Sequence, residues 1–180
     1  MSSSASIPGD NADDEVILVD SDDRQIGTEP KMPVHLSGKL HRAFSVFVFG
    51  DDGCVMLQQR AFSKYHSGGL WTNTCCSHPR PGESIDDAAH RRLREEMGFD
   101  CALERKFSFI YRAQLDKGLT EHEFDHVFIG KFNGTPALNS QEAAGWRWAK
   151  PDSVDRDILA NPQNYTVWFR IAWQELRARK

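Results

Sequence analysis

The sequence contains no apolar run that approaches the ~20 residues needed for a membrane-spanning helix. It has no excess of positive charge either, because 22 Lys and Arg face 26 Asp and Glu, a formal net charge of −4. This balance argues against a general nucleic-acid binder, although a local group of Lys and Arg can still bind a small anion. Residues 1–14 are rich in Ser and Asp and lack the basic-then-apolar pattern of a signal peptide. We therefore expect a cytoplasmic protein that binds neither membranes nor nucleic acid, with a disordered tail over residues 1–14.

Cysteine is scarce, and the four residues present are Cys54, Cys75, Cys76 and Cys101. Cys75 and Cys76 are adjacent, and a chain of 180 residues can build a core without disulfides. We therefore expect free thiols in a reducing compartment and one domain over residues 15–180. A structural zinc site from Cys75, Cys76 and His78 is disfavoured because the Cys-x₂-Cys spacing of zinc ribbons is missing.

The apolar pattern predicts several strands around one prominent helix, a mixed α+β arrangement. The segment Arg42–Phe49 is apolar on both faces, as in a strand buried on both sides. Asp51, Asp52 and Gly53 then form a hairpin signal before the return strand at 54–60. With Pro33 and Gly38 as breakers, we expect residues 31–39 to form a loop. Further strands are expected at 15–20, 107–113, 123–132 and 146–148, irregular chain at 61–74, and an amphipathic helix at 165–179.

The clearest helix is predicted from Ser84, which can cap its start, to Met97, which precedes a terminating Gly98. At 100° per residue, Arg92 and Glu96 fall on the same side as its apolar residues, where isolated charges are costly. They either pair with each other, four residues apart, or bind ligands. In the second case Glu96 would bind a metal and Arg92 an anion.

Three histidines and two carboxylates are candidate metal ligands. Glu121 and Glu123 are two apart in the strand predicted at 123–132 and its lead-in, so in extended chain their side chains project from one face. Such a pair, together with His35, His41 and His78, would suit a divalent cation such as Mn²⁺, Zn²⁺ or Mg²⁺. A scattered His is more often structural, and a Glu-x-Glu pair is usually a solvated strand face.

The helix resembles the Nudix box, a strand–loop–helix motif that binds a divalent metal and a diphosphate. The match is Glu83, seven residues, and then RRLREEMGF from Arg91 onward. Two positions depart, since Ser77 stands where the pattern has its first Gly and Arg92 replaces a Glu. Because that Glu helps hold the metal of the hydrolases, its loss argues against pyrophosphate cleavage.

Longer segments resemble type I isopentenyl-diphosphate isomerases over nearly the whole chain. They are HLSGKLHRAFS, QQRAFSKYHSGGLWTNTCCSHPRPGES, RRLREEMGF, YRAQ and EHEFDH. The resemblance implies a Nudix-like α/β/α sandwich, a mixed sheet with flanking helices, and a small prenyl diphosphate as substrate. It also implies that His35, His41, His78, Glu121 and Glu123 bind a metal, either Mn²⁺ or Zn²⁺.

The same resemblance implies the catalytic and substrate-binding residues. Cys76 and Glu123 would transfer protons on opposite faces of the substrate, with Tyr111 assisting, and Trp168 would face a carbocation. In an extended segment Cys76 shares a face with His78 whereas Cys75 does not; otherwise Cys76 is simply a small buried apolar residue. The diphosphate would be bound by Lys31, Arg60, Lys64 and Arg92, with Mg²⁺ bridging it to Glu96.

Two other functions remain open at this point. One is a Nudix pyrophosphohydrolase, against which Arg92 and the TNTCCSHP segment both count. The other is a non-catalytic metal or diphosphate sensor, against which the Cys, Glu and Tyr at the matching positions count. For the isomerase, we expect a monomer or a weak homodimer.

Overall fold

The computed structural model describes residues 14–179, so the expected tail lies outside the described residues apart from Asp14. In this part of the chain nine strands form one mixed sheet, and four α-helices pack around it. No helix in the range combines the length and the apolar character required to span a bilayer. The strands are β1 (Glu15–Val19), β2 (Gln25–Pro30), β3 (His41–Phe49), β4 (Val55–Arg60), β5 (Trp71–Thr72), β6 (Cys75–Ser77), β7 (Leu103–Gln114), β8 (Thr120–Lys131) and β9 (Ala143–Ala149). The helices are α1 (Lys31–Ser37), α2 (Ile85–Met97), α3 (Pro151–Ala160) and α4 (Val167–Ala178), with short 3₁₀ turns at Asp116–Gly118 and Pro162–Asn164.

Strand β3 is the centre of the sheet because it pairs with four other strands. It runs parallel to β8 along its whole length, which sets His41 opposite Glu123. Along its other edge β6 pairs antiparallel, with Ser45 opposite Cys76. Short contacts with β1 and β4 extend the sheet at either end of β3. The N-terminal half of β3 therefore lies between the strand that carries the two glutamates and the strand that carries the adjacent cysteines.

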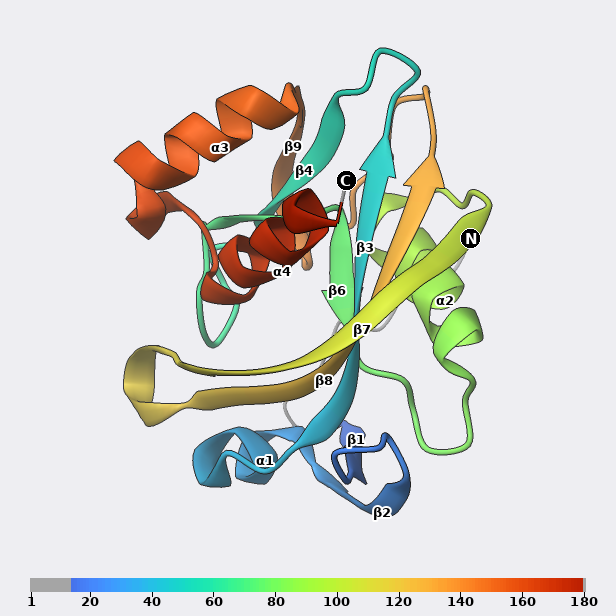
Figure 1. Cartoon of the computed structure of the whole chain (residues 1–180), viewed down its shortest axis with the longest axis vertical. Coiled ribbons are helices and arrows are strands. Elements are labelled where there is room, and N and C mark those ends of the chain that lie inside the picture. The colour runs from blue at the N-terminus through green and yellow to red at the C-terminus, as the bar shows by residue number, and fades with distance from the viewer. Residues whose placement is uncertain (1–13, 180) are drawn as a thin grey trace, which may run out of the picture.

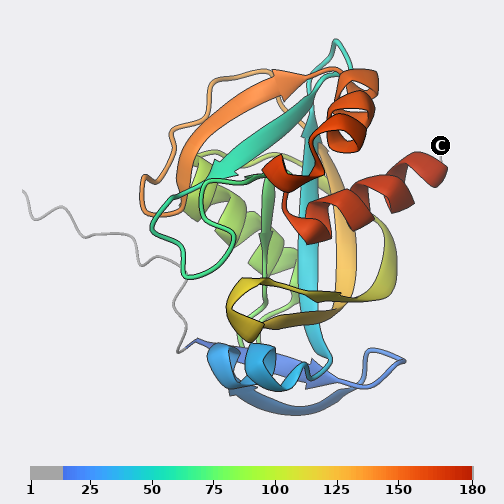
Figure 2. The ribbon, with the colours of Figure 1, turned by 90° about the vertical axis from the view of Figure 1, so that its left-hand side faces the viewer.

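Helices cover both faces of this sheet and give three layers (Figures 1 and 2). On one face α2 packs against β3 and β6, and its Leu93 and Met97 join a cluster with Phe44 and Val46. On the other face α3 and α4 cover a second apolar cluster, built from Phe47, Val55, Leu57, Val127, Val154, Ile158, Phe169, Ala172 and Trp173. Each large apolar side chain buried in these layers stabilises the fold by about 1.5–3 kcal/mol. The expected α/β/α sandwich is confirmed.

Helix α2 has the predicted capping residues at both ends. The hydroxyl of Ser84 accepts a hydrogen bond from the backbone N–H of Asp87 at 3.1 Å, and Gly98 ends the helix with φ +70°. Arg92 and Glu96 are both 4% exposed. The charged stripe inferred from the sequence is therefore buried, and it points toward the site described below.

The expectation of a loop at residues 31–39 is wrong, since residues Lys31–Ser37 form helix α1. Pro33 lies in the first turn, where the missing N–H has no helical partner to lose, so the proline is tolerated. Gly38, with φ +66°, provides a left-handed end to the same helix. Residues interpreted as loop breakers are thus the start and stop signals of a two-turn helix.

Two further differences concern the C-terminal half. Helix α3 was not predicted, although Pro151 begins it and Val154 and Ile158, four residues apart, are its buried residues. Strands β7 and β8 are longer than expected and form a curved hairpin with its tip near the 61–70 loop (Figure 1). At that tip the ammonium of Lys117 donates to the backbone carbonyl of Tyr65 at 2.8 Å.

We expect Gly98→Ala to destabilise the fold strongly. A Cβ at this position would lie 2.2 Å from the carbonyl oxygen of Ala137, and the residue also has positive φ. Strain and overpacking together should lower the free energy of unfolding by about 3 kcal/mol, measured by urea denaturation. Gly82→Ala is the matched control, since its φ is +80° but no atom lies within 4 Å of the added Cβ. It should cost only about 1 kcal/mol, and equal losses in the two variants would contradict the account.

Candidate active site and metal centre

Five side chains from different elements converge on one point. They are His35 of α1, His41 at the start of β3, His78 after β6, and Glu121 and Glu123 on β8. One ligand atom from each lies within 4.8 Å of all the others. His78 is half-buried and the other four are buried. All five sequence-predicted ligands are therefore brought together by the fold.

Contacts within this cluster already hold the ligand atoms close to one another. The Nε2 of His35 lies 3.1 Å from Glu121 Oε2, and the Nε2 of His78 lies 2.9 Å from Glu123 Oε1. The Nε2 atoms of His41 and His78 face each other at 3.2 Å. Three nitrogen donors and two carboxylates at such distances form a set that suits a divalent cation.

Partners outside the cluster orient two of the imidazoles. The Nδ1 of His41 lies 3.0 Å from the carbonyl of Lys39, to which it can donate. The Nδ1 of His35 lies 3.2 Å from the hydroxyl of Tyr65. An outer hydrogen bond of this kind fixes the ring and directs the other nitrogen, Nε2, at the metal position.

Burial and mutual charge shift the pKa values of the cluster in opposite directions. Burial lowers the pKa of His78 to about 4, which keeps its imidazole neutral. Burial raises the pKa of Glu123, but hydrogen bonds from His41 and His78 outweigh it and hold that pKa well below its usual range. Burial and the charge of Glu123 raise the pKa of Glu121. In His41 burial acts to lower the pKa, yet Glu123 and Glu121 raise it overall.

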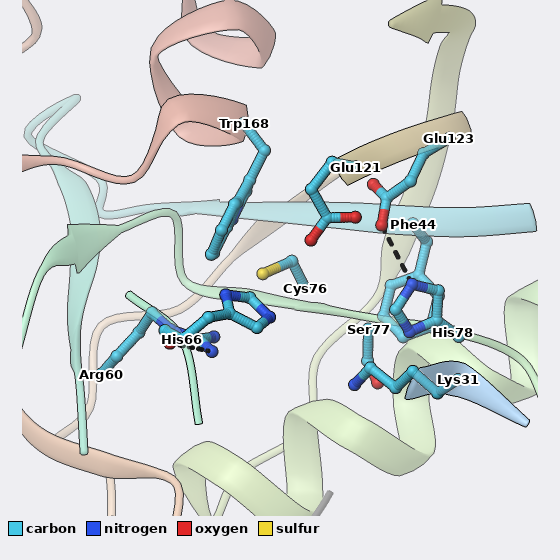
Figure 3. A pocket seen from close by; sticks show the side chains of 10 residues that line it. All are labelled: Lys31, Phe44, Arg60, His66, Cys76, Ser77, His78, Glu121, Glu123 and Trp168. Carbon is cyan, nitrogen blue, oxygen red and sulfur yellow. Dashed lines mark hydrogen bonds and ion pairs between the residues drawn. The ribbon is translucent and has the colours of Figure 1, made fainter. Parts of the chain in front are cut away.

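A pocket adjoins the cluster (Figure 3). Cys76 lies on its floor, Glu121 and Glu123 form one wall and Trp168 forms another. The indole Nε1 of Trp168 donates to Thr72 Oγ1 at 3.0 Å, which fixes the ring in the wall. Six further residues complete the lining: Lys31, Phe44, Arg60, His66, Ser77 and His78.

Cys76 and its neighbour point to opposite sides of β6, as the alternation of the strand requires. Cys76 faces the pocket, whereas Cys75 is fully buried in the apolar cluster beneath α2. Burial raises the pKa of the Cys76 thiol to about 12. A thiol with such a pKa carries its proton at neutral pH.

Tyr111 and Glu123 form a buried pair across the β7–β8 hairpin. The phenol of Tyr111 donates to Glu123 Oε2 at 2.6 Å. The other oxygen of Glu123 contacts His78, so this carboxylate connects the histidine cluster to the phenol. Burial and the charge of Glu123 raise the pKa of Tyr111 well above its ordinary value, so the phenol remains a donor.

Cations surround the pocket to different extents. Lys31 and Arg60 line it directly. Arg92 lines a neighbouring pocket that shares Lys31, Ser77 and His78 with the first. Lys64 lines neither of these two pockets and pairs instead with the carboxylate of Glu142.

Glu96 lies outside the five-residue cluster. Arg92 donates to it at 2.9 Å, so the ion pair that the sequence left open is present. Its other oxygen accepts from the side-chain amide of Gln58 at 2.9 Å. Burial raises the pKa of Glu96, and the charge of Arg92 opposes that rise.

Two residues that the sequence did not single out belong to this region. Glu142, 2% exposed, lies 3.0 Å from Arg92 and also pairs with Lys64, so it joins two of the predicted anion ligands. His66, 4% exposed, lies in the pocket wall beside Trp168. Both come from segments without regular periodicity, so only tertiary contacts reveal them.

Known proteins resemble this chain both in fold and in sequence. A family model described as NUDIX domain matches residues 39–169. In solved structures, a protein from Deinococcus radiodurans has a TM-score of 0.70 at 19% identity, covering 82% of this chain and 90% of its own. A MutT protein from Methanosarcina mazei has a TM-score of 0.63 at 16% identity, covering 78% and 94%. At these identities the structures establish the fold.

Curated relatives are much more similar in sequence. The Isopentenyl-diphosphate Delta-isomerase 2 of Aromatoleum aromaticum is 54% identical over 157 residues, which is 87% of this chain and 83% of that protein. The Isopentenyl-diphosphate Delta-isomerase of Serratia proteamaculans is 50% identical over 168 residues, 93% and 94% respectively. Such identity over nearly the whole of both chains, together with the NUDIX match, shows that this chain belongs to the isopentenyl-diphosphate Delta-isomerase family of NUDIX-fold enzymes.

Proposed function

We propose that this enzyme interconverts isopentenyl diphosphate and dimethylallyl diphosphate by protonation and deprotonation through a tertiary carbocation. The observation that carries the proposal is the placement of Cys76 and Glu123 in one pocket beside the His/Glu cluster. The names of relatives about half identical in sequence support the same reaction.

The chemistry requires a proton to enter at one carbon and another to leave a different carbon. Protonation of the terminal methylene gives the tertiary cation, and loss of a proton from the carbon on the diphosphate side gives the allylic product. No electrons leave the substrate, and the diphosphate stays attached. Two proton-transfer groups, one on the floor and one in the wall of the same pocket, fit this demand.

Cys76 and Glu123 are the residues we assign to these two transfers. The Cys76 thiol carries a proton at neutral pH, since burial raises its pKa. Glu123 is ionised, and Tyr111 donates to it at 2.6 Å, so the phenol assists as the carboxylate gains or loses a proton.

Trp168 contributes an aromatic face to the wall of the pocket. We infer that its indole stabilises the carbocation by a cation–π interaction, which is favourable by about 2 kcal/mol in a desolvated site. Fixation of the ring by Thr72 supports this role.

We infer that Mn²⁺, or Zn²⁺, binds to His35, His41, His78, Glu121 and Glu123. When bound, the ion supplies positive charge that holds both carboxylates ionised. The diphosphate would be bound by Lys31, Arg60, Lys64 and Arg92, and Glu96 would hold Mg²⁺ beside it. The burial of Arg92 and Glu96 and the lining positions of Lys31 and Arg60 support this arrangement.

We further propose that residues 15–180 act as one domain in the cytoplasm, as a monomer or a weak homodimer. All four cysteines are unpaired, which fits a reducing compartment.

The reaction can be tested by incubating the protein with isopentenyl diphosphate and Mg²⁺ in deuterated water and following the product by NMR. We expect dimethylallyl diphosphate that carries deuterium, with no release of phosphate. Cys76→Ala and Glu123→Gln should each reduce turnover by at least ~100-fold. Cys75→Ala is the matched control, because its side chain faces the apolar cluster under α2, and it should keep most activity.

Unchanged substrate, combined with cleavage of other diphosphate compounds, would instead support a NUDIX pyrophosphohydrolase. Tight binding of the substrate without turnover would support a sensor.

Metal affinity should increase with pH. The raised pKa values of Glu121 and His41 mean that these groups still hold protons as the pH falls, and a metal must displace them. Titration calorimetry with Mn²⁺ at about pH 6 and pH 8 should therefore show tighter binding at the higher pH. Heats measured in buffers of different ionisation enthalpy should reveal proton release. Affinity that does not vary with pH, without proton release, would contradict the assignment.

A further inference from the structure

His66 is a buried polar residue in the pocket that the proposed chemistry does not use. It lies in the 61–70 loop, is 4% exposed and lines the same cavity as Lys31, Arg60 and Cys76. Figure 3 shows its imidazole projecting into the pocket below Trp168, next to Cys76 and in front of Arg60. A buried imidazole in such a position either fills space or interacts with the ligand.

The surroundings of His66 fix the orientation of its ring. Its plane is nearly perpendicular to those of Tyr65 and Trp168, with ring centroids 4.5 Å and 5.7 Å apart. Its Nδ1 lies 3.2 Å from the hydroxyl of Ser67. Ser67 has φ +51°, a conformation that costs a non-glycine residue about 1 kcal/mol or more. The loop therefore holds the hydroxyl against the ring at an energetic cost.

The Ser67 hydroxyl can decide which nitrogen carries the proton. A hydroxyl that donates to Nδ1 leaves the proton of a neutral imidazole on Nε2. That tautomer presents an N–H donor on the side of the ring away from Ser67. The opposite tautomer would present a lone pair there, which an anionic ligand would repel.

The surroundings of Arg60, which contacts the backbone carbonyl of His66, favour an anion in this part of the pocket. Arg60 is 8% exposed, the Nε of its guanidinium has no hydrogen-bond partner, and among residues 14–179 no carboxylate pairs with it. Its one protein hydrogen bond is a long one, in which NH2 donates to the carbonyl of His66 at 3.4 Å. A buried cation without a counter-charge is costly, so the position favours a bound anion. His66 and Arg60 would then contact the same group.

We propose that His66 binds the diphosphate of the substrate, donating a hydrogen bond from Nε2, and that Ser67 is the positioning residue that sets this tautomer. The inference rests on the proposed function, since it takes the prenyl diphosphate as the ligand. It adds an imidazole N–H donor to the set of cations.

Binding of inorganic pyrophosphate to the Mg²⁺-supplemented protein tests this proposal separately from catalysis. His66→Phe keeps a ring against Trp168 but lacks the donor, and should weaken pyrophosphate binding, measured by calorimetry, by about 10- to 100-fold. His66→Gln can place an amide N–H near the position of Nε2 and should bind within a few-fold of the native protein. Ser67→Ala should lose less than His66→Phe. Ser63→Ala, an exposed serine of the same loop, is the matched control and should change nothing.

Steady-state kinetics give a second measure. If His66 donates a hydrogen bond to the diphosphate, His66→Phe should raise KM for isopentenyl diphosphate more than it lowers kcat. Equal pyrophosphate affinity for the native protein, His66→Phe and His66→Gln would overturn the proposal. So would equal weakening in Phe and Gln variants that are folded by circular dichroism, since an N–H donor restored at this position would then recover no affinity. If the native protein binds pyrophosphate through His66 but does not isomerise the substrate, the proposed function fails and the assignment of His66 stands.

Discussion

The parallel pairing of β3 with β8 is the constraint on which the site depends. This register sets His41 opposite Glu123, and the alternation of the strand then places Glu121 on the same face as Glu123. On the other edge of β3, the pairing of Ser45 with Cys76 brings the thiol into the same end of the sheet. A slip of one residue between β3 and β8 would turn both glutamates away from the histidines. The apolar packing on both faces of β3 therefore fixes the catalytic geometry as well as the core.

The same end of the sheet carries many buried charges, which the fold tolerates only through pairing. Arg92 contacts Glu95, Glu96 and Glu142, and Lys64 pairs with Glu142. Removing one partner of a buried ion pair destabilises the fold by more than the pair stabilises it, because the remaining charge stays buried without a counter-charge. Arg60 differs, since its guanidinium lies over the Trp168 ring, 5.0 Å from the centroid, and no carboxylate among residues 14–179 pairs with it. Arg92 and Lys64 therefore have carboxylate partners within the fold, whereas the charge of Arg60 has none among residues 14–179.

Glu123 connects these parts of the site. One of its oxygens contacts His78 and the other accepts from Tyr111, so a single carboxylate joins the histidine cluster to the buried phenol. Two positions further along β8, Asp125 is buried and accepts from the hydroxyl of Ser45 at 2.8 Å. Burial and the nearby charge of Glu123 raise the pKa of Asp125 well above its ordinary value, which favours its uncharged form. Three acidic residues at alternate positions can thus share one buried face.

Much of this protein was predictable from local sequence. The apolar run of β3, the Asp-Gly hairpin signal, and the Ser84 and Gly98 caps of α2 all act within a few residues, so the elements they specify were predicted correctly. The inward placement of Arg92 and Glu96 and the opposite faces of Cys75 and Cys76 follow from helix and strand periodicity alone. The resemblance of whole segments to a known family added the set of candidate metal ligands.

Local signals also misled, because Pro33 and Gly38 can lie near the start and end of a helix such as α1 as readily as they can break one. Tertiary structure alone decided the rest: the pairing of Glu142 with Arg92 and Lys64, the position of His66 beside Trp168, and the convergence of five ligands from α1, β3, β8 and the chain after β6. Contacts between residues dozens of positions apart are set by strand register and layer packing, which short-range periodicity does not encode.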